Sequence, residues 1–160
     1  MFEDERAGGL RTKKRIGIIG GNEADQRLYE IAFEVGKLIA KNDAILICGG
    51  LGGVMEAASK GAKSMGGITI GIIPSSNIKD ANRYIDIPIS TGIGLARNLM
   101  VVLNSDVLIA IDGKYGTLSE ISYALIFGKR VIGLETWDIE GVKKAHNPEE
   151  AIKFALYDHK

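Results

Sequence analysis

The chain has 160 residues, of which 46% are hydrophobic and 25% charged, a composition typical of one compact globular domain whose core needs neither disulfides nor metal. Its 20 basic and 20 acidic residues give a formal net charge of zero, which argues against a broad electrostatic field for nucleic acid or an anionic membrane. The single cysteine, Cys48, excludes an internal disulfide framework, and we expect it to be buried in the core where a strand ends.

The N-terminal segment carries no recognisable targeting signal. Residues 1–6 lack the basic and then apolar order of a secretory signal, and no apolar run approaches the roughly 18 residues that cross a bilayer. We therefore expect a cytoplasmic protein with no membrane as partner. Residues 1–14 are polar and punctuated by glycine, which predicts a flexible N-terminal arm before a single domain over residues 15–160.

Short apolar segments alternate with amphipathic segments along the predicted domain. In chain order, the apolar segments predict strands at 15–19, 44–48, 68–73, 84–89 (interrupted by Pro88), 107–111 and 131–134. The amphipathic segments predict helices at 25–42, 54–65, 95–104, 117–127 and 148–156. Continuous apolar strands flanked by helices favour a parallel sheet covered on both faces. The predicted fold class is therefore α/β, a single Rossmann-like, doubly wound, mostly parallel sheet with helices on both faces.

Two glycine-rich turns each follow a predicted strand and precede a predicted helix. The first spans residues 49–53 and reads GGLGG, and the second spans residues 113–117 and reads GKYGT. Both fall at the carboxyl ends of strands, where ligands bind in doubly wound sheets. The free N–H groups and the dipole of a helix start favour negative charge, so we expect a phosphate-bearing ligand at these turns. The alternative is that the glycines only turn the chain tightly.

The two best-known nucleotide motifs are absent from the sequence. A dinucleotide fingerprint needs GxGxxG after the first strand and an acidic residue closing the second, whereas residues 17–22 read GIIGGN and the second strand ends in Cys48. No run matches GxxxxGK followed by Ser or Thr, the phosphate loop of many ATPases. We therefore expect neither NAD bound in the usual way nor a P-loop ATPase.

Polar residues near the two turns are candidates for the chemistry. Thr117 and Glu120 form TxxE, the pattern of a capping box at a helix start. Alternatively, the Glu120 carboxylate holds ribose hydroxyls or stabilises an oxocarbenium-like transition state. Arg97 either lies on the surface or points into the ligand cleft, where a guanidinium suits phosphate. Asn22 either contacts a base or ribose or is an ordinary turn asparagine.

The histidines, the single tryptophan and the longest basic run predict no further site. His146 and His159 have no cysteine or carboxylate at metal-ligand spacing, so we expect no metal bound by protein ligands. We expect Trp137 to pack under a loop or at a subunit contact rather than on a ligand. The longest basic run, residues 13–15, is too short to predict a nucleic-acid patch.

Several of these motifs occur in an order that resembles a known superfamily. Residues 49–55, Arg97, residues 105–106 and the second turn through Glu120 resemble the pattern GGxxGxM, Arg, Ser-Asp and GxGTxxE, with one extra residue in the second turn. This is the pattern of the lysine decarboxylase-like, or Lonely Guy (LOG), superfamily, and the resemblance covers roughly residues 16–135. The superfamily includes nucleoside 5′-monophosphate phosphoribohydrolases and the molybdenum cofactor carrier proteins. The resemblance implies a homodimer or higher homo-oligomer, a phosphate site at the second turn, and Arg97 and Glu120 as the catalytic residues of a hydrolase.

The sequence departs from the hydrolase pattern at two places. Residues 112–114 read DGK where the hydrolases have Pro-Gly-Gly, and Asn98 stands where they have lysine after the arginine. These departures favour a branch close to the cofactor carriers. We do not expect a pyridoxal decarboxylase, because that chemistry needs a Schiff-base lysine in a dedicated cofactor site and Lys114 in a turn is poor support for one.

Two functions therefore remain open. The first is a carrier that binds a nucleoside monophosphate or a nucleotide-like cofactor, such as the molybdenum cofactor, without chemistry. The second is a phosphoribohydrolase that cleaves the N-glycosidic bond of a nucleoside 5′-monophosphate to free base and ribose 5-phosphate, with no cofactor required for catalysis. In both, the partner is a small phosphorylated ligand. The residues expected to bind it are Gly20, Gly21, Asn22, Gly49, Gly50, Gly52, Gly53, Met55, Gly113, Tyr115, Gly116 and Thr117.

Overall fold

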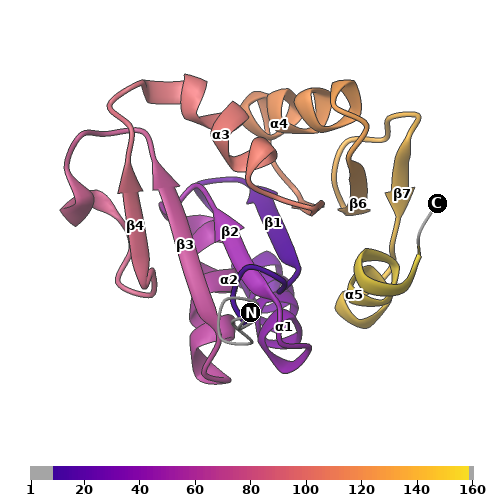
Figure 1. The fold of residues 1–160 in the computed structure, drawn as a ribbon. Helices are drawn as coiled ribbons and strands as arrows, with labels where there is room; N and C mark the ends of the chain where they lie inside the picture. The colour runs from indigo at the N-terminus through magenta and orange to yellow at the C-terminus, as the bar shows by residue number, and fades with distance from the viewer. Residues whose placement is uncertain (1–8, 159–160) are drawn as a thin grey trace, which may run out of the picture.

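The computed structural model describes residues 9–158 and contains one sheet of seven strands, paired in parallel throughout (Figure 1). The strands are β1 Arg15–Gly20, β2 Ile45–Cys48, β3 Ile68–Ile73, β4 Ile87–Ser90, β5 Val107–Ile111, β6 Arg130–Leu134 and β7 Val142–Lys144. The helices are α1 Gln26–Lys41, α2 Gly53–Ser64, α3 Arg97–Leu103, α4 Tyr115–Ile126 and α5 Pro148–Tyr157, with short 3-10 turns η1 Ile78–Asp80 and η2 Gly94–Ala96. The Rossmann-like α/β fold predicted from the sequence is confirmed.

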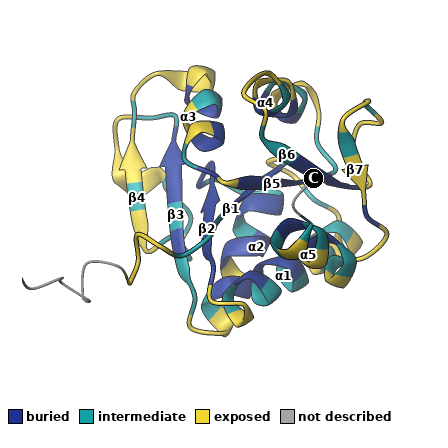
Figure 2. Cartoon of the chain, turned by 45° about the vertical axis from the view of Figure 1, so that its right-hand side comes forward, coloured by how far each residue is buried: buried dark blue, intermediate teal, exposed yellow. Residues whose placement is uncertain are grey.

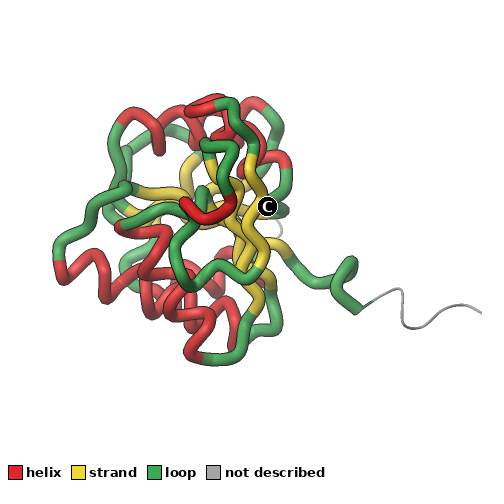
Figure 3. The backbone as a smooth tube through the Cα atoms, turned by 90° about the vertical axis from the view of Figure 1, so that its left-hand side faces the viewer, coloured by secondary structure: helices red, strands yellow, loops and turns green. Residues whose placement is uncertain are grey.

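The sheet lies between two layers of helices (Figure 3). Helices α1, α2 and α5 cover one face, and α3 and α4 cover the other (Figure 1). Successive side chains of a strand point to opposite faces, so Leu46 and Cys48 of β2 join the core under α1 and α2, while Ile45 and Ile47 join the core under α3 and α4. Figure 2 shows the central strands and the inner sides of the helices buried. Cys48 lies in the core, as expected.

Helices α1 and α2 pack so closely that their backbones touch. A Cβ on Gly36 would lie 1.8 Å from Ala58 O, and a Cβ on Gly61 would lie 1.9 Å from Phe33 O. Glycine at both crossing points therefore allows the contact. The start of α1 is capped by the Asp25 side chain, which accepts from Leu28 N.

The strand order is β4-β3-β2-β1-β5-β6-β7. From β1 the chain winds outward through β2 and β3 to β4, then returns to place β5 on the other side of β1. The connections after β1 and after β5 consequently run to opposite faces of the sheet, which opens a crevice at the carboxyl ends of these two strands. In the described part of the chain, 9–158, no helix is long and apolar enough to cross a bilayer.

Some predicted boundaries were wrong at the edges of the sheet. The strand predicted at 84–89 is shorter and later, Ile87–Ser90, and its Pro88 is tolerated because β4 is an edge strand. The three-residue edge strand β7 was not predicted, because Val142–Lys144 is too short to show a period. The helix predicted at 95–104 is split into η2 and α3, and the one predicted at 117–127 begins at Tyr115.

The N-terminal arm predicted over 1–14 falls largely outside the described residues. Residues 1–8 and 159–160 are not described, so the predicted arm is represented only by residues 9–14, which form turns ahead of β1. In this segment Lys13 Nζ pairs with Asp43 Oδ1 at 2.5 Å. The predicted site residues all lie within the described part.

Candidate functional site

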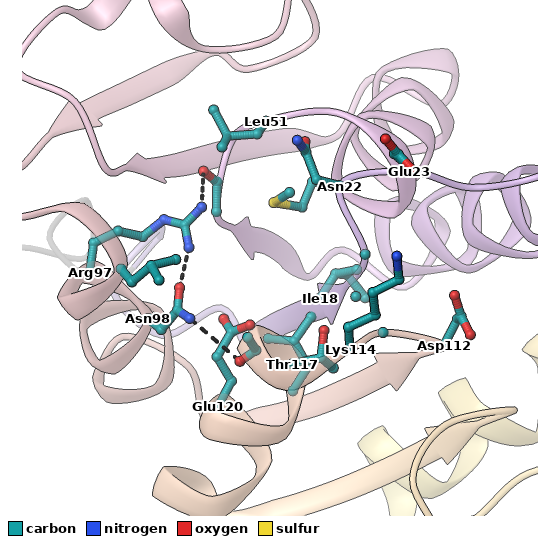
Figure 4. A pocket seen from close by; sticks show the side chains of 18 residues that line it. Ile18, Asn22, Glu23, Leu51, Arg97, Asn98, Asp112, Lys114, Thr117 and Glu120 are labelled. Carbon is teal, nitrogen blue, oxygen red and sulfur yellow. Dashed lines mark hydrogen bonds between the residues drawn. The ribbon is translucent and has the colours of Figure 1, made fainter.

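A cavity of about 380 Å³ lies at the carboxyl ends of β1, β2 and β5, where the strand order reverses (Figure 4). Figure 4 shows Arg97 and Asn98 on one side of it and Lys114 and Asp112 on the other. The remaining walls come from the turns after β1 and β2 and from the start of α4. The lining residues are Ile18, Ile19, Gly20, Gly21, Asn22, Glu23, Gly49, Leu51, Met55, Leu95, Arg97, Asn98, Asp112, Gly113, Lys114, Gly116, Thr117 and Glu120.

The turn after β5 has a backbone that few residues tolerate. Asp112 has a φ of 51° and Gly113 a φ of 103°, both in the left-handed region. A Cβ on Gly113 would lie 2.2 Å from Thr117 Oγ1, so glycine is required there for space as well as for φ. Helix α4 begins two residues later at Tyr115, and the side chain of its N-cap, Lys114, makes no capping hydrogen bond.

The start of α4 leaves three backbone donors free. Within residues 9–158, the N–H groups of Tyr115, Gly116 and Thr117 have no hydrogen-bond partner. The first hydrogen bond at this end of the helix runs from Leu118 N to Lys114 O over 3.0 Å. Free donors together with the positive end of the helix dipole make a site for an anion. Gly116 and Thr117 both line the cavity, so this anion site opens into it.

The interpretation of TxxE as a capping box is wrong. Because α4 begins at Tyr115, Thr117 is the third residue of the helix and Glu120 the sixth. A capping box needs its hydroxyl at the N-cap and its carboxylate at the third helical position. Both side chains are buried and face the cavity instead (Figure 4).

The turn before α2 uses two of its N–H donors, those of Gly52 and Val54, within the protein. Gly52 N donates to Asn22 Oδ1 over 2.8 Å, and Val54 N donates to Gly21 O over 3.0 Å. Gly53 has a φ of 58°, and a Cβ there would lie 2.4 Å from Gly21 O, so the turns after β1 and β2 are in direct contact. This helix start is therefore hydrogen-bonded to the neighbouring turn, and Asn22 is the residue that joins them.

Arg97, at the start of α3, is buried in the wall of the cavity with 6% of its surface exposed. Its Nη1 donates to Asn98 Oδ1 and its Nη2 donates to Gly49 O over 3.3 Å, while the buried Nε has no partner in the described structure. A Cβ on Gly49 would lie 2.7 Å from Nη2, which explains the glycine at that position. Burial lowers the pKa of Arg97, and the charge of Glu120 partly offsets this.

Glu120 lies between Arg97 and Thr117 at the base of the cavity (Figure 4). Burial raises the pKa of Glu120 to about 8, even though the positive charge of Arg97 acts to lower it. No ion pair joins the two side chains among the described residues. At pH 7 the Glu120 side chain is thus mainly a neutral carboxylic acid, which can donate a hydrogen bond as well as accept one.

The structure brings most of the predicted site residues together. Those that line the cavity are Gly20, Gly21, Asn22, Gly49, Met55, Arg97, Gly113, Gly116, Thr117 and Glu120. Those that do not are Gly50, Gly52, Gly53 and Tyr115. Gly50 is needed for its φ of 74° and because a Cβ would lie 2.6 Å from Ile73 Cγ2. Tyr115 is 81% exposed, with its ring centroid 6.1 Å from that of Trp137.

The lining residues that sequence analysis missed are Ile18, Ile19, Glu23, Leu51, Leu95, Asn98, Asp112 and Lys114. Asn98 was noted only as a departure from the hydrolase pattern, yet its Nδ2 donates to Gly116 O over 3.4 Å and so connects α3 to the start of α4. Glu23 and Leu51 belong to turns that had already been singled out, and neighbourhood in those turns was the available signal. Leu95, predicted as the first residue of a helix, lies in the 3-10 turn η2.

Trp137 packs under the turn that precedes α4, with its Nε1 donating to Lys114 O over 3.1 Å. A second cavity, of about 330 Å³, lies beyond this tryptophan and was not predicted. It is lined by Gly133, Glu135, Thr136, Trp137, Asp138, Val142, Lys144, Ala145 and His146.

The two histidines give no metal site in the part of the chain that the structure describes. His146 Nδ1 lies 3.1 Å from Glu150 Oε2, a carboxylate four residues away that the sequence analysis overlooked. Within residues 9–158 no three His, Cys, Asp or Glu side chains are grouped to hold a metal ion. His159 lies outside the described residues.

Comparison with known proteins places the chain among cofactor-binding relatives. A structure of the molybdenum cofactor binding protein from Rippkaea orientalis is 41% identical, covers 89% of this chain and 94% of that one, and superposes with a TM-score of 0.84. The Moco carrier protein from Chlamydomonas reinhardtii is 37% identical over 88% of this chain and 93% of its own, with a TM-score of 0.80. An uncharacterized protein of Archaeoglobus fulgidus is 49% identical over 144 residues, 89% of this chain and 94% of its own length.

These relatives confirm the resemblance to the LOG superfamily, in a branch close to the molybdenum cofactor carriers. A family model covers nearly the whole described chain, matching residues 13–158. This chain belongs to the SLOG cluster4 family.

Proposed function

We propose that this protein is a carrier that binds a phosphate-bearing, nucleotide-like cofactor in the cavity at the switch point, and that its cargo is the molybdenum cofactor. The observation that carries the proposal is the start of α4, where three unpartnered N–H groups stand beside the Thr117 hydroxyl at a cavity wall. A cavity of about 380 Å³ is within the size range of small-molecule sites. The two solved relatives, a molybdenum cofactor binding protein and a Moco carrier, support the choice of cargo.

The donors around the cavity suit the organic part of such a cofactor. The phosphate would take the N–H groups of α4, which neutralise part of its charge without a cationic side chain. The Arg97 Nε, buried and without a partner among the described residues, is a donor that a ligand atom would satisfy. The neutral Glu120 acid, whose pKa burial raises to about 8, can pair with a ring that offers both a donor and an acceptor.

The state of Glu120 favours binding over hydrolysis. Cleavage of an N-glycosidic bond builds positive charge on the ribose, and a carboxylate stabilises that charge only when it is ionised. Burial holds the pKa of Glu120 near 8, and a phosphate bound nearby would raise this pKa further because like charges repel. A mainly neutral acid at pH 7 is a poor catalyst for this step but a good hydrogen-bonding group for a cofactor.

AMP serves as a test ligand because it carries a phosphate monoester on a nucleoside. We expect purified protein to be stabilised by AMP, by about 2.7 kcal/mol at a concentration of 100 times its Kd, with no adenine released on overnight incubation. Thermal melting measures the first quantity and chromatography the second. The molybdenum cofactor, supplied from a denatured molybdenum enzyme, should co-elute with the protein in gel filtration.

Three outcomes would contradict this proposal in different ways. Release of adenine at a rate proportional to protein concentration would establish the hydrolase. Absence of stabilisation by AMP together with absence of co-eluting cofactor would remove the phosphate site. Stabilisation by AMP without co-elution of the molybdenum cofactor would retain the phosphate site and reject the cargo.

The outer face of α3 and α4 supports self-association into a homodimer or larger assembly. Lys129 Nζ donates to Leu103 O over 3.2 Å, which sets the carboxyl ends of the two helices side by side. Leu103, at the end of α3, and Ile126 and Phe127, at the end of α4, are exposed apolar residues, and Ile126 is 73% exposed. A second copy, which presents the same patch, is the occupant we propose because a two-fold axis makes such a patch self-complementary. Sedimentation velocity should show a dimer or larger for the wild type and a monomer for Ile126→Glu.

A further inference from the structure

The segment after β6 holds the turn after β5 by two hydrogen bonds. Thr136 Oγ1 donates to Asp112 O over 2.7 Å, and Trp137 Nε1 donates to Lys114 O over 3.1 Å. Both acceptors belong to the strained turn that leads into α4. Neither Thr136 nor Trp137 lines the first cavity, so neither has a direct role in the ligand site described above.

The segment after β6 has a strained backbone and is bonded to other parts of the fold. Glu135, directly after β6, has a φ of 51°, matching the φ of 51° at Asp112 directly after β5. Arg27 on α1 pairs with the Glu135 carboxylate at 2.7 Å, and Asp112 N donates to Leu134 O over 3.2 Å. Left-handed backbone at residues other than glycine persists only where the surroundings hold it. The two adjacent turns therefore support each other's conformation.

Because the peptide unit is planar, a hydrogen bond that fixes a carbonyl also fixes the direction of the N–H in the same unit. In a trans peptide the C=O and the N–H of the same unit point in opposite directions, and the described chain has no cis peptide bond. Because Thr136 binds the Asp112 carbonyl, it fixes the direction of the Gly113 N–H. Because Trp137 binds the Lys114 carbonyl, it fixes the direction of the Tyr115 N–H, the first free donor of α4. Both hydrogen bonds hold a carbonyl to the β6 side and leave the N–H of the same peptide pointing away from it.

We propose that Thr136 and Trp137 are positioning residues for phosphate, which act through the peptide units 112–113 and 114–115 and never touch the ligand. The inference rests on the proposed phosphate site at α4. Thr136 has the larger effect of the two. The Lys114 carbonyl also accepts the helical bond from Leu118 N over 3.0 Å, so it stays oriented without Trp137, whereas Thr136 Oγ1 is the only described donor to the Asp112 carbonyl.

The test titrates AMP into ¹⁵N-labelled wild type, Thr136→Val and Trp137→Phe, following the backbone amide signals of Gly113 and Tyr115. Thr136→Val keeps the shape of the side chain and removes the donor, and we expect about fivefold weaker AMP binding, the size of one hydrogen bond, with a smaller shift of the Gly113 amide at saturation. Trp137→Phe keeps a ring and removes the N–H, and we expect about twofold weaker binding. Thr136→Ser restores the hydroxyl and should bind AMP like the wild type.

The control for a merely structural effect is Thr91→Val. Thr91 Oγ1 donates to Ile73 O over 2.7 Å, so this variant also loses a bond from a threonine hydroxyl to a backbone carbonyl, but after a different strand. It should lower the melting temperature without changing the Kd for AMP. Trp137 is the only tryptophan, so quenching of its fluorescence by AMP provides a second reading of the same binding in all variants that keep it.

The outcomes separate this inference from the function on which it rests. If AMP shifts none of the amides of Gly113, Tyr115 and Gly116 in the wild type, the phosphate site itself is wrong. If the wild type binds AMP there and Thr136→Val binds it with the same Kd and the same Gly113 shift, the positioning role is overturned. If Thr136→Val does not fold, a twofold loss in Trp137→Phe supports the role and an unchanged Kd rejects it.

Discussion

The two glycine-rich turns have similar sequences and different chemistry. Each joins a central strand to a helix, and each is rich in glycine with a glutamate a few residues into the helix, Glu56 in α2 and Glu120 in α4. At α2 the Gly52 and Val54 N–H groups donate to Asn22 Oδ1 and Gly21 O, which joins two loops, while Gly53 N and Met55 N have no described partner. At α4 the first three donors have no described partner. A helix start becomes a ligand site only where the neighbouring chain leaves its N–H groups unused.

The glycine substitutions Gly113→Ala and Gly53→Ala should give the largest difference between the two turns. A Cβ at position 113 meets Thr117 Oγ1 at 2.2 Å, and one at position 53 meets Gly21 O at 2.4 Å, both with positive φ. Each variant should lose about 2 to 3 kcal/mol of unfolding free energy from strain and overlap. Only Gly113→Ala should also weaken AMP binding, by tenfold or more, because Gly113 lines the cavity beside the three free N–H groups of α4 and Gly53 does not line it. Urea unfolding and AMP titration measure the two effects.

Gly128→Ala is the matched control for the glycine pair. Gly128 has a φ of 68° with nothing within 4 Å of an added Cβ, so this variant reports the strain of a positive φ alone. It should be destabilised less than the other two and bind AMP normally. Equal loss of AMP affinity in Gly53→Ala and Gly113→Ala, both folded, would show that the two turns share the ligand after all.

The buried glutamate of α4, Glu120, should make the stability of the folded protein depend on pH. Burial raises the pKa of Glu120 from an ordinary 4.5 to about 8. Between these two pH values the folded protein therefore holds a proton that the unfolded chain has already released. The resulting stability is fully present below pH 4.5 and is lost as the pH rises through 8, an amount of at most about 5 kcal/mol. Glu120→Gln should abolish this fall between pH 5 and pH 8, as measured by urea unfolding at each pH.

A wild-type unfolding free energy that does not decline from pH 5 to pH 8 would mean that Glu120 is ionised in the folded protein. An ionised Glu120 would then be able to stabilise the positive charge that builds on the ribose during hydrolysis. AMP incubation of Glu120→Gln then becomes the decisive assay, because loss of adenine release by about a hundredfold in a folded variant would identify a catalytic carboxylate.

The smallest effect should come from breaking the contact between the turn after β1 and the turn before α2. Asn22→Ala removes the acceptor for Gly52 N, a bond of 2.8 Å, and should cost about 1 kcal/mol of unfolding free energy. AMP affinity should change by less than twofold, since Asn22 holds a loop and the proposed phosphate site is at α4. A tenfold loss of affinity without loss of stability would instead make Asn22 a ligand-binding residue.

The alternation of apolar and amphipathic segments was sufficient to predict the α/β fold, because the period of a buried strand differs from that of a helix along the chain itself. It was also sufficient to predict that the turns after β2 and β5 face the site, since the carboxyl ends of parallel strands share one edge. The edge strand β7 was not predicted because a strand of three residues is too short to show a hydrophobic period.

What the tertiary structure alone decided is how each predicted residue is used. The sequence around Thr117 and Glu120 matches a capping box, and only the observed start of α4 at Tyr115 shows that both side chains face the cavity instead. The two glycine turns look equivalent along the chain, and only contacts between distant segments occupy the Gly52 and Val54 donors of one and leave the first three donors of the other free. The protonation of Glu120 likewise depends on burial by neighbours from other elements. Hydrogen bonding and desolvation are properties of the packed neighbourhood, so no local pattern contains them.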